Sequence, residues 1–296
     1  MHVLVLGGTG LIGSAVLEEL KARGHGVLAL ARSNASAEKA ARLGAAVLRG
    51  DIARPEIWVP ALPPVDAVIH TAGDFDSNMA KIDRRLLDVL LPHLAAQPLK
   101  PRFLYTGGNW LFGATGDAVA TEESAFAPLP AFAWMVAQLQ RVRESDAVDG
   151  IVIHPAMVYD GSGGGVFRRF GQEATERQAV RVVGSESVHW PLVRHDDLAA
   201  LYALALESAP SRSIYMGVAI DAFPVGRIAR AFARRFRTPH IEPKIISVDV
   251  IAAERGDWAR GYALDQRLSG AKARRELGWA PRSLDPETEI AALPDR

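Results

Sequence analysis

The chain has 296 residues, and its 34 basic residues balance 34 acidic ones, so its formal net charge is zero. This balance argues against a nucleic-acid or membrane-surface partner. Cysteine is absent, which excludes disulfides, thiolate catalysis and Cys-ligated zinc. Apolar residues make up 49% of the sequence, but no apolar run is long enough to span a bilayer and no secretory signal precedes the first strand. We therefore expect a soluble cytoplasmic protein with a sizeable core.

The N-terminal segment has the pattern of a strand, a tight turn and a helix. The apolar run His2–Leu6 leads into Gly7, Gly10 and Gly13, and an amphipathic helical pattern covers residues 11–23. In a dinucleotide-binding turn the first glycine permits the turn, the second lets a pyrophosphate approach the backbone, and the third lets the helix pack close to the strand. The helix N-terminus favours the phosphates. We predict a dinucleotide site with contacts from Gly7, Thr9, Gly10, Leu11, Ile12 and Gly13.

Strand and helix patterns alternate along the first half of the chain. The strands are continuous apolar runs, which is typical of a sheet covered on both faces. We expect strands at residues 2–6, 27–31, 45–48, 65–70, 102–106 and 151–154. We expect helices at residues 11–23, 35–43, 79–91 and 131–143, with Pro92 marking an end or a kink. This order predicts an α/β fold with a Rossmann-type doubly wound parallel sheet, whose ligands bind beyond the carboxyl ends of the strands.

The second half of the chain does not continue the regular alternation of strand and helix patterns. We predict a dinucleotide-binding core at residues 1–160, and mostly a small C-terminal α/β substrate lobe at 161–296, interleaved with the last core strands and helices. Strands are expected at 180–183 and 213–218, and helices at 166–177, 198–207, 224–237 and 271–277. The last helix has Ser269 as its expected N-cap and Gly278 at its end. The glycine-rich segment 160–165 is interpreted as a mobile loop or lid hinge rather than a second phosphate cradle, because no strand–helix turn frames it.

Further segments follow the N-terminal turn in a characteristic order, at residues 50–52, 68–73, 105–113, 154–159, 193–199 and 274–281. Together they resemble the extended or atypical short-chain dehydrogenases/reductases, the NAD-dependent epimerase/dehydratase superfamily. The resemblance implies a NAD(P)-dependent oxidoreductase or epimerase-like enzyme that acts on a small carbonyl, hydroxyl or sugar-derived substrate. It also implies that Asp51 lies near the adenine, within a set of cofactor contacts formed by Asp51, Ile52, Thr71, Ala72, Gly73, Thr106, Pro155 and Met157.

The residues that transfer the proton in this superfamily are the part of the resemblance that this sequence lacks. In this superfamily a Tyr-x-x-x-Lys pair on one helix transfers the proton, assisted by a Ser or Thr at the preceding strand exit. The best-aligned segment puts Phe132 at the Tyr position and Val136 at the Lys position. The serine position falls on Gly107 or Gly108. The usual proton-transfer mechanism therefore cannot run at these positions.

Two explanations stay open. Other residues handle the proton, with Tyr159 and Asn109 as weak catalytic candidates, or the protein is a non-catalytic NADP-binding sensor or interaction protein. Asn109 and Trp110, which follow the fifth strand, are also predicted to contact the substrate. His70 and His154 lie within apolar strands and are interpreted as hydrogen-bonded histidines of the core or its rim.

The end of the second strand indicates which cofactor is bound. An NAD site usually places an acid there for the ribose 2′-hydroxyl, but this chain has Arg32 and Ser33. A guanidinium and a hydroxyl suit a 2′-phosphate, although Arg32 could also stack on the adenine of either cofactor. We predict NADP, with NAD as the alternative. No His, Asp or Glu cluster has metal-binding spacing, so we expect no metal, a small-molecule substrate, and a monomer or homodimer.

Overall fold

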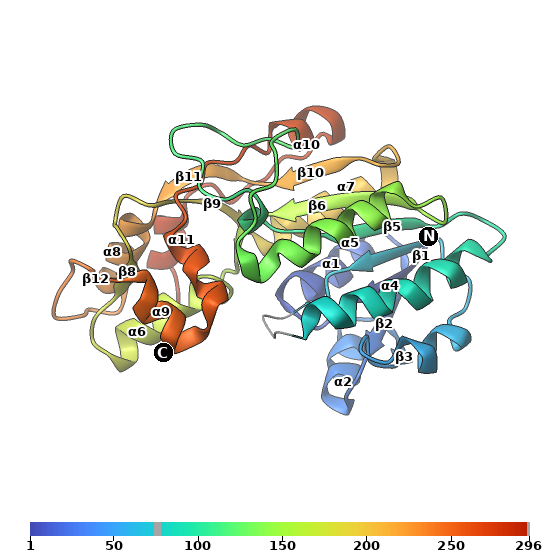
Figure 1. Cartoon of the computed structure of the whole chain (residues 1–296). Coiled ribbons are helices and arrows are strands. Elements are labelled where there is room, and N and C mark those ends of the chain that lie inside the picture. Colours follow the sequence, from blue (N-terminus) through green and yellow to red (C-terminus); the bar gives the residue numbers. More distant parts are fainter. Residues whose placement is uncertain (74–77, 295–296) are drawn as a thin grey trace.

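The computed structural model describes residues 1–73 and 78–294. Seven strands form one sheet in the order β10-β6-β5-β4-β1-β2-β3 (Figure 1). Every neighbouring pair runs parallel, which confirms the predicted doubly wound fold. The strands are β1 (His2–Leu6), β2 (Gly26–Ala31), β3 (Ala46–Arg49), β4 (Ala67–His70), β5 (Arg102–Thr106), β6 (Asp149–Pro155) and β10 (Ile214–Gly217).

Helices cover both faces of this sheet. Helices α4 and α5 contact each other on one face, and α1 and α7 contact each other on the other (Figure 1). Leu17 and Leu20 of α1 and Leu86 and Leu90 of α4 are fully buried against the strands. The bounds are α1 (Leu11–Ala22), α2 (Asn34–Arg42), α3 (Pro55–Trp58), α4 (Met79–Ala95), α5 (Ala133–Glu144) and α7 (His195–Ser208). Across the described ranges, we find no helix that combines the length and apolar character needed to cross a membrane.

Helix α4 differs from the end expected at Pro92. The helix runs through this proline and ends at Ala95. A proline inside a helix removes one backbone hydrogen bond and crowds the preceding turn. Leu90, Leu91 and Leu94 are buried on both sides of it, so the apolar face of the last turn stays anchored to the core. Packing of that face therefore outweighs the local cost of the proline.

A second group of elements lies beyond the carboxyl ends of the large sheet's strands (Figure 1). We call it the C-terminal lobe. It has two small sheets, ordered β11-β9-β7 and β12-β8, and its own apolar core, which includes Phe170, Trp190 and Phe232. Its elements are β7 (Met157–Tyr159), α6 (Arg168–Glu176), β8 (Arg181–Val183), β9 (His189–Arg194), β11 (Ile220–Pro224), α8 (Val225–Arg235), β12 (Lys244–Ile246), α9 (Val248–Arg255), the 3₁₀ helix η4 (Asp257–Ala263) and α11 (Pro286–Ala291). Since α7 and β10 return to the large sheet between these elements, the two parts are interleaved.

Helix α10 (Ala271–Leu277) packs on α7 and β10. Gly270 occupies the N-cap position, one residue after the expected Ser269, but the Ser269 hydroxyl still accepts from the Ala271 N–H over 3.2 Å. The backbone N–H of Ser269 donates to the carbonyl of Ala120, which holds Ser269 in the preceding extended segment. At the other end Gly278 adopts the left-handed conformation with φ of 64°, as predicted.

Candidate functional site

The glycine turn after β1 leaves space at one glycine and none at the other two. Gly7 has φ of 82°, and a Cβ there would lie 2.6 Å from the backbone nitrogen of Ala72. A Cβ on Gly13 would lie 2.1 Å from the Gly7 carbonyl oxygen. At Gly10, among the described residues, a Cβ would meet only that same oxygen, at 3.4 Å. Gly7 and Gly13 are thus required by packing within the protein, whereas Gly10 leaves the backbone open to an approaching group.

The N-terminus of α1 is built to receive an anion. Gly10 is its N-cap and provides no side-chain cap, so no side chain occupies the N–H groups of the first turn. These groups and the positive end of the helix dipole favour a phosphate at this point. Thr71 closes the neighbouring strand exit, where its hydroxyl donates to the Leu6 carbonyl over 2.8 Å. The donor set and the open backbone at Gly10 fit a dinucleotide pyrophosphate.

The loop after β3 is fixed around Asp51. One Asp51 carboxylate oxygen accepts from the Ala53 N–H (2.9 Å), and the Asp51 carbonyl accepts from the Trp58 indole (3.0 Å). Ser33 is the N-cap of α2, and its hydroxyl accepts from the Ser36 N–H (3.1 Å) in a capping box. Ser33 therefore has a structural role beside its expected contact with the cofactor.

Basic side chains gather between the ends of β2 and β3. Arg32 is exposed there, Lys39 donates to the Thr9 carbonyl (2.8 Å), and Arg49 donates to the Ser33 carbonyl (2.7 Å). Sequence reasoning missed Lys39 and Arg49. Strand register could have found Arg49, because Ala31 and Arg49 are paired in the sheet. We call Arg32, Lys39 and Arg49 the basic cluster.

A cavity of about 510 Å³ lies at the exits of β4, β5 and β6. Its cofactor side is formed by residues of the glycine turn and the strand exits, Leu11, Ile12, Thr71, Ala72, Gly73, Thr106, Pro155 and Met157. Its other side is formed by residues of the α5 region and the C-terminal lobe, Trp110, Phe132, Trp134, Met135, Gly165, Val166, Arg168, Trp258 and Tyr262. The cavity therefore runs continuously from the glycine turn to the lobe.

The lobe side of the cavity is aromatic. The Trp110 ring lies 5.5 Å from Phe132, 6.1 Å from Trp258 and 5.7 Å from Tyr262, measured between ring centroids. Trp110 also rests on Gly261, where a Cβ would lie 2.4 Å from its ring. Such closely spaced rings form a rigid wall that suits a flat apolar group.

The exit of β5 is shaped by a buried histidine. The Gly108 N–H donates to His154 Nδ1 (3.2 Å), and burial lowers the pKa of His154 to about 4. A Cβ on Gly107 would lie 2.3 Å from that nitrogen, whereas one on Gly108 would meet no atom within 4 Å. A serine is thus sterically excluded at position 107 but not at position 108. His154 lies in the core as a neutral hydrogen-bond acceptor, in line with its interpretation from the sequence.

Asn109 joins the large sheet to the C-terminal lobe. Its side-chain Nδ2 donates to Gln266 Oε1 (2.8 Å), and Gln266 Nε2 donates back to the Asn109 carbonyl (2.9 Å). Thr106, at the end of β5, also lines the cavity. Its hydroxyl shares a hydrogen bond of 2.6 Å with the Tyr202 hydroxyl. Asn109 and Thr106 are the uncharged polar side chains at the fifth-strand exit that line the cavity.

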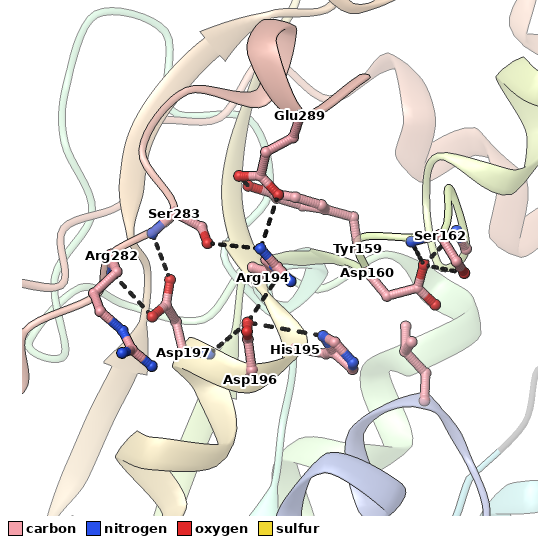
Figure 2. A network of polar contacts seen from close by, with 12 residues as sticks. Tyr159, Asp160, Ser162, Arg194, His195, Asp196, Asp197, Arg282, Ser283 and Glu289 are labelled. Carbon is pink, nitrogen blue, oxygen red and sulfur yellow. Dashed lines mark hydrogen bonds and ion pairs between the residues drawn. The ribbon is translucent and has the colours of Figure 1, made fainter. Parts of the chain in front are cut away.

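Tyr159 lies in a different environment from the one expected of a proton donor. Its hydroxyl donates to Glu289 Oε1 (3.1 Å), and burial followed by the nearby Glu289 carboxylate raises its pKa. Arg194 lies 3.5 Å from the other Glu289 oxygen (Figure 2). Tyr159 is absent from the residues that line the cavity. Its hydroxyl is instead directed at α11, in a polar network that ties this helix to the start of α7 (Figure 2).

The glycine-rich segment 160–165 is held by its first residue. Asp160 Oδ1 accepts from the Ser162 N–H (2.8 Å), the Ser162 hydroxyl (2.7 Å) and the Gly164 N–H (2.7 Å) (Figure 2). These hydrogen bonds lower the pKa of Asp160 in spite of its burial. The segment is thus an ordered turn around a carboxylate, and its last residue, Gly165, lines the cavity.

A buried polar cluster in the cavity wall confirms His70 as a hydrogen-bonded histidine and adds Asp83 and Tyr105, which the sequence did not indicate. Asp83 of α4 accepts from His70 Nε2 (2.8 Å) and from the Tyr105 hydroxyl (2.9 Å). All three side chains are at most 3% exposed, and burial together with the Asp83 charge raises the pKa of Tyr105. Asp83 therefore links β4, α4 and β5. Among the described residues, no group of three or more metal-binding side chains comes together.

Comparisons with known proteins extend this description. The family model for the NAD dependent epimerase/dehydratase family matches residues 3–217. An uncharacterised protein of Saccharomyces cerevisiae is 29% identical over 99% of this chain and 98% of its own length. The epimerase family protein SDR39U1 of Bos taurus is 25% identical over 98% of both chains.

Solved structures show the same fold. Human epimerase family protein SDR39U1 with NADPH superposes with a TM-score of 0.79 at 20% identity, covering 99% of both chains. DesIV, a dTDP-glucose 4,6-dehydratase from Streptomyces venezuelae with NAD bound, gives a TM-score of 0.82 at 19% identity, covering 98% of this chain and 95% of that one. The first of these neighbours thus holds NADPH and the second holds NAD on the same fold.

Proposed function

Because the chain belongs to the NAD-dependent epimerase/dehydratase family, we propose that it is an NADP-dependent oxidoreductase or epimerase-like enzyme of an atypical short-chain dehydrogenase branch that works without a Tyr-x-x-x-Lys pair. The observation that carries this proposal is the cavity, which runs without interruption from the glycine turn to the aromatic wall. A substrate against that wall lies next to the nicotinamide end of a cofactor on the turn. A merely structural glycine turn would need no such cavity.

The residues of the cofactor side fit a bound dinucleotide. Backbone N–H groups at the start of α1 would hold the pyrophosphate, and Asp51 and Ile52 would flank the adenine. Thr71–Gly73, Thr106, Pro155 and Met157 would line the nicotinamide ribose. The cofactor supplies hydride transfer, and the protein supplies position and polarity.

The basic cluster favours NADP. A 2′-phosphate adds up to two negative charges, which Arg32, Lys39 and Arg49 are placed to neutralise at the end of β2. No acid stands at that strand end to accept from the 2′-hydroxyl of NAD. The first backbone N–H groups of α2 would add donors for the same phosphate.

Catalysis without the pair relies on neutral donors. Phe132 lines the cavity without a hydroxyl, and Val136 packs against the core without a charge. An Asn side chain has two N–H donors, so Asn109 keeps one beyond its bond to Gln266. Either hydroxyl can donate in the Thr106–Tyr202 hydrogen bond, and the arrangement in which Tyr202 donates would leave the Thr106 proton for a substrate. Asn109 and Thr106 would polarise a substrate carbonyl, and water would supply the final proton.

The test is cofactor binding followed by turnover. Purified protein is titrated with NADPH and NADH by fluorescence and then assayed with a panel of aldehydes, ketones and alcohols. We expect NADPH to bind more tightly and to be oxidised by a subset of the carbonyl compounds. Asn109→Ala should lower kcat by about 10- to 100-fold while leaving the affinity for NADPH unchanged. Failure to bind either dinucleotide would contradict the proposal.

A second candidate function is favoured by Phe132 and Val136. The protein would be a non-catalytic NADP-binding sensor or interaction protein, because Phe132 and Val136 offer neither a proton nor a charge. This candidate predicts NADPH binding with no oxidation across the whole panel. Turnover of any carbonyl compound at a rate that depends on Asn109 would exclude it.

A further inference from the structure

The charged groups in the cavity wall are few. Of the described residues that line it, Asp83 and Arg168 carry formal charge, apart from the imidazole of His70. Both oxygens of the Asp83 carboxylate already accept hydrogen bonds. The guanidinium of Arg168 makes no hydrogen bond or ion pair with the parts of the chain that the structure describes, although most arginines near it in the lobe are paired. Arg168 is therefore a solvent-exposed positive charge, without a protein partner among the described residues, at the edge of an apolar cavity.

The backbone around Arg168 reinforces this charge. Arg168 is the first residue of α6, and the N-cap Phe167 provides no side-chain cap. The Arg168 N–H donates to the Gly165 carbonyl over 3.2 Å, and the positive end of the helix dipole lies at the residue that carries the guanidinium. Gly165 and Val166, just before it, also line the cavity. Two independent sources of positive potential therefore meet at one end of the cavity.

The aromatic side of the cavity wall indicates which kind of carbon skeleton the substrate has. Trp110, Phe132, Trp258 and Tyr262 form neighbouring ring contacts between 5.5 and 6.1 Å. Flat ligands stack on such rings with little loss of conformational entropy. The wall offers few hydrogen-bond partners for the many hydroxyl groups of a sugar.

We infer that the substrate is a planar, ring-containing carbonyl compound with a carboxylate, whose ring lies against the aromatic wall and whose carboxylate binds Arg168. This inference rests on the proposed function for its reaction: the carbonyl, NADPH and one proton give the alcohol and NADP. A guanidinium fork matches a carboxylate in two parallel hydrogen bonds. The single net charge of a carboxylate matches the one guanidinium, whereas a nucleoside diphosphate would bring two or more charges to it.

The intrinsic fluorescence of the protein reports on this site directly. Three of the six tryptophans, Trp110, Trp134 and Trp258, line the cavity, so a stacked ligand should quench them. The protein saturated with NADP is titrated with 4-formylbenzoate and, in parallel, with its neutral methyl ester. We expect the carboxylate to bind about tenfold more tightly than the ester.

Variants of α6 separate charge from structure. Arg168→Ala should weaken binding of 4-formylbenzoate about tenfold and leave binding of the ester unchanged, and Arg168→Lys should restore part of the affinity. The matched control is Arg177→Ala, an exposed arginine at the other end of the same helix and outside the cavity. It should change neither affinity. In turnover, Arg168→Ala should raise KM for the carboxylate with little change in kcat.

The outcomes keep the two proposals apart. Equal affinity for acid and ester, no quenching by either, or the same loss in Arg177→Ala would overturn the carboxylate site. Turnover of both compounds with no effect of Arg168→Ala would overturn this inference while supporting the proposed function. Arg168-dependent binding without any NADPH oxidation would support the site and contradict the proposed function.

Discussion

The cofactor side and the substrate side of the cavity are built in different ways. The cofactor side adjoins the glycine turn, whose backbone depends on the missing side chains of Gly7, Gly10 and Gly13. The substrate side is made of side chains from segments far apart in the chain, such as Trp110 and Tyr262. Backbone geometry of this kind tolerates almost no change, whereas a wall of side chains can be altered one residue at a time. The difference explains how a family can keep its cofactor site while its chemistry varies.

The strongest test of this contrast is a single methyl group in the glycine turn. We predict that Gly13→Ala lowers affinity for NADPH more than about 100-fold, because its Cβ would lie 2.1 Å from the Gly7 carbonyl. The free energy of unfolding should also fall, by about 2 kcal/mol. Gly108→Ala is the matched control, since its Cβ meets no atom within 4 Å, and its stability should equal that of the wild type. Tight NADPH binding by Gly13→Ala would show that the turn is looser than described.

A second test concerns His154, the buried histidine next to the exit of β5. His154 titrates near pH 4 in the folded protein and near 6.5 when unfolded, so the unfolded state binds more protons between these values. Its contribution is fully present above pH 6.5 and is lost as the pH falls toward 4. We predict a loss of about 3 kcal/mol across this window in urea denaturation. In His154→Gln this part of the slope should disappear; an identical slope in both proteins would contradict the neutral, buried histidine.

A third test concerns which cofactor the cofactor side of the cavity prefers. We predict that Arg32→Ala weakens NADPH binding about tenfold and NADH binding less than twofold, because only NADPH carries the 2′-phosphate. Arg42→Ala, at the far end of α2, is the matched control and should affect neither cofactor. Equal losses for both cofactors in Arg32→Ala would mean that the guanidinium stacks on the adenine instead.

The smallest effect is expected at Phe132 and Val136, which the sequence pattern assigns to the positions of the usual Tyr and Lys. We predict that Phe132→Tyr combined with Val136→Lys changes kcat less than about threefold, since Asn109 and Thr106 already polarise the carbonyl. Initial rates of NADPH oxidation under saturating substrate provide the measurement. An increase of 100-fold or more would show that the wild type lacks an effective donor, and would favour the sensor over the enzyme.

Much of the cofactor side could be predicted from the sequence because its signals are local. The glycine spacing, the apolar runs of β1 and β4, and the basic end of β2 each lie within a short stretch of chain. Arg49 and Lys39 escaped detection because they approach Ser33 and Thr9 only through strand pairing and helix packing. The assignment of NADP and the boundary at residue 160 remain predictions.

The substrate side could be predicted only in part, because its contacts are long-range. Trp110 was identified from its place after β5, but its neighbours Trp258 and Tyr262 come from η4, about 150 residues later in the chain. The sequence gives no sign that Asp83 is buried, because its partners His70 and Tyr105 come from two neighbouring strands and leave it only 1% exposed. The sequence made Tyr159 a weak catalytic candidate, and it could not show that the Tyr159 hydroxyl donates to Glu289, 130 residues away.

The central claim is that a cavity without the Tyr-x-x-x-Lys pair still supports NADPH-dependent carbonyl reduction. The most direct measurement is NADPH oxidation by the wild-type protein with 4-formylbenzoate and the wider carbonyl panel, alongside Asn109→Ala. We predict reduction by the wild type, with NADPH preferred over NADH and kcat reduced in the variant. Tight NADPH binding with no oxidation by any compound would contradict it.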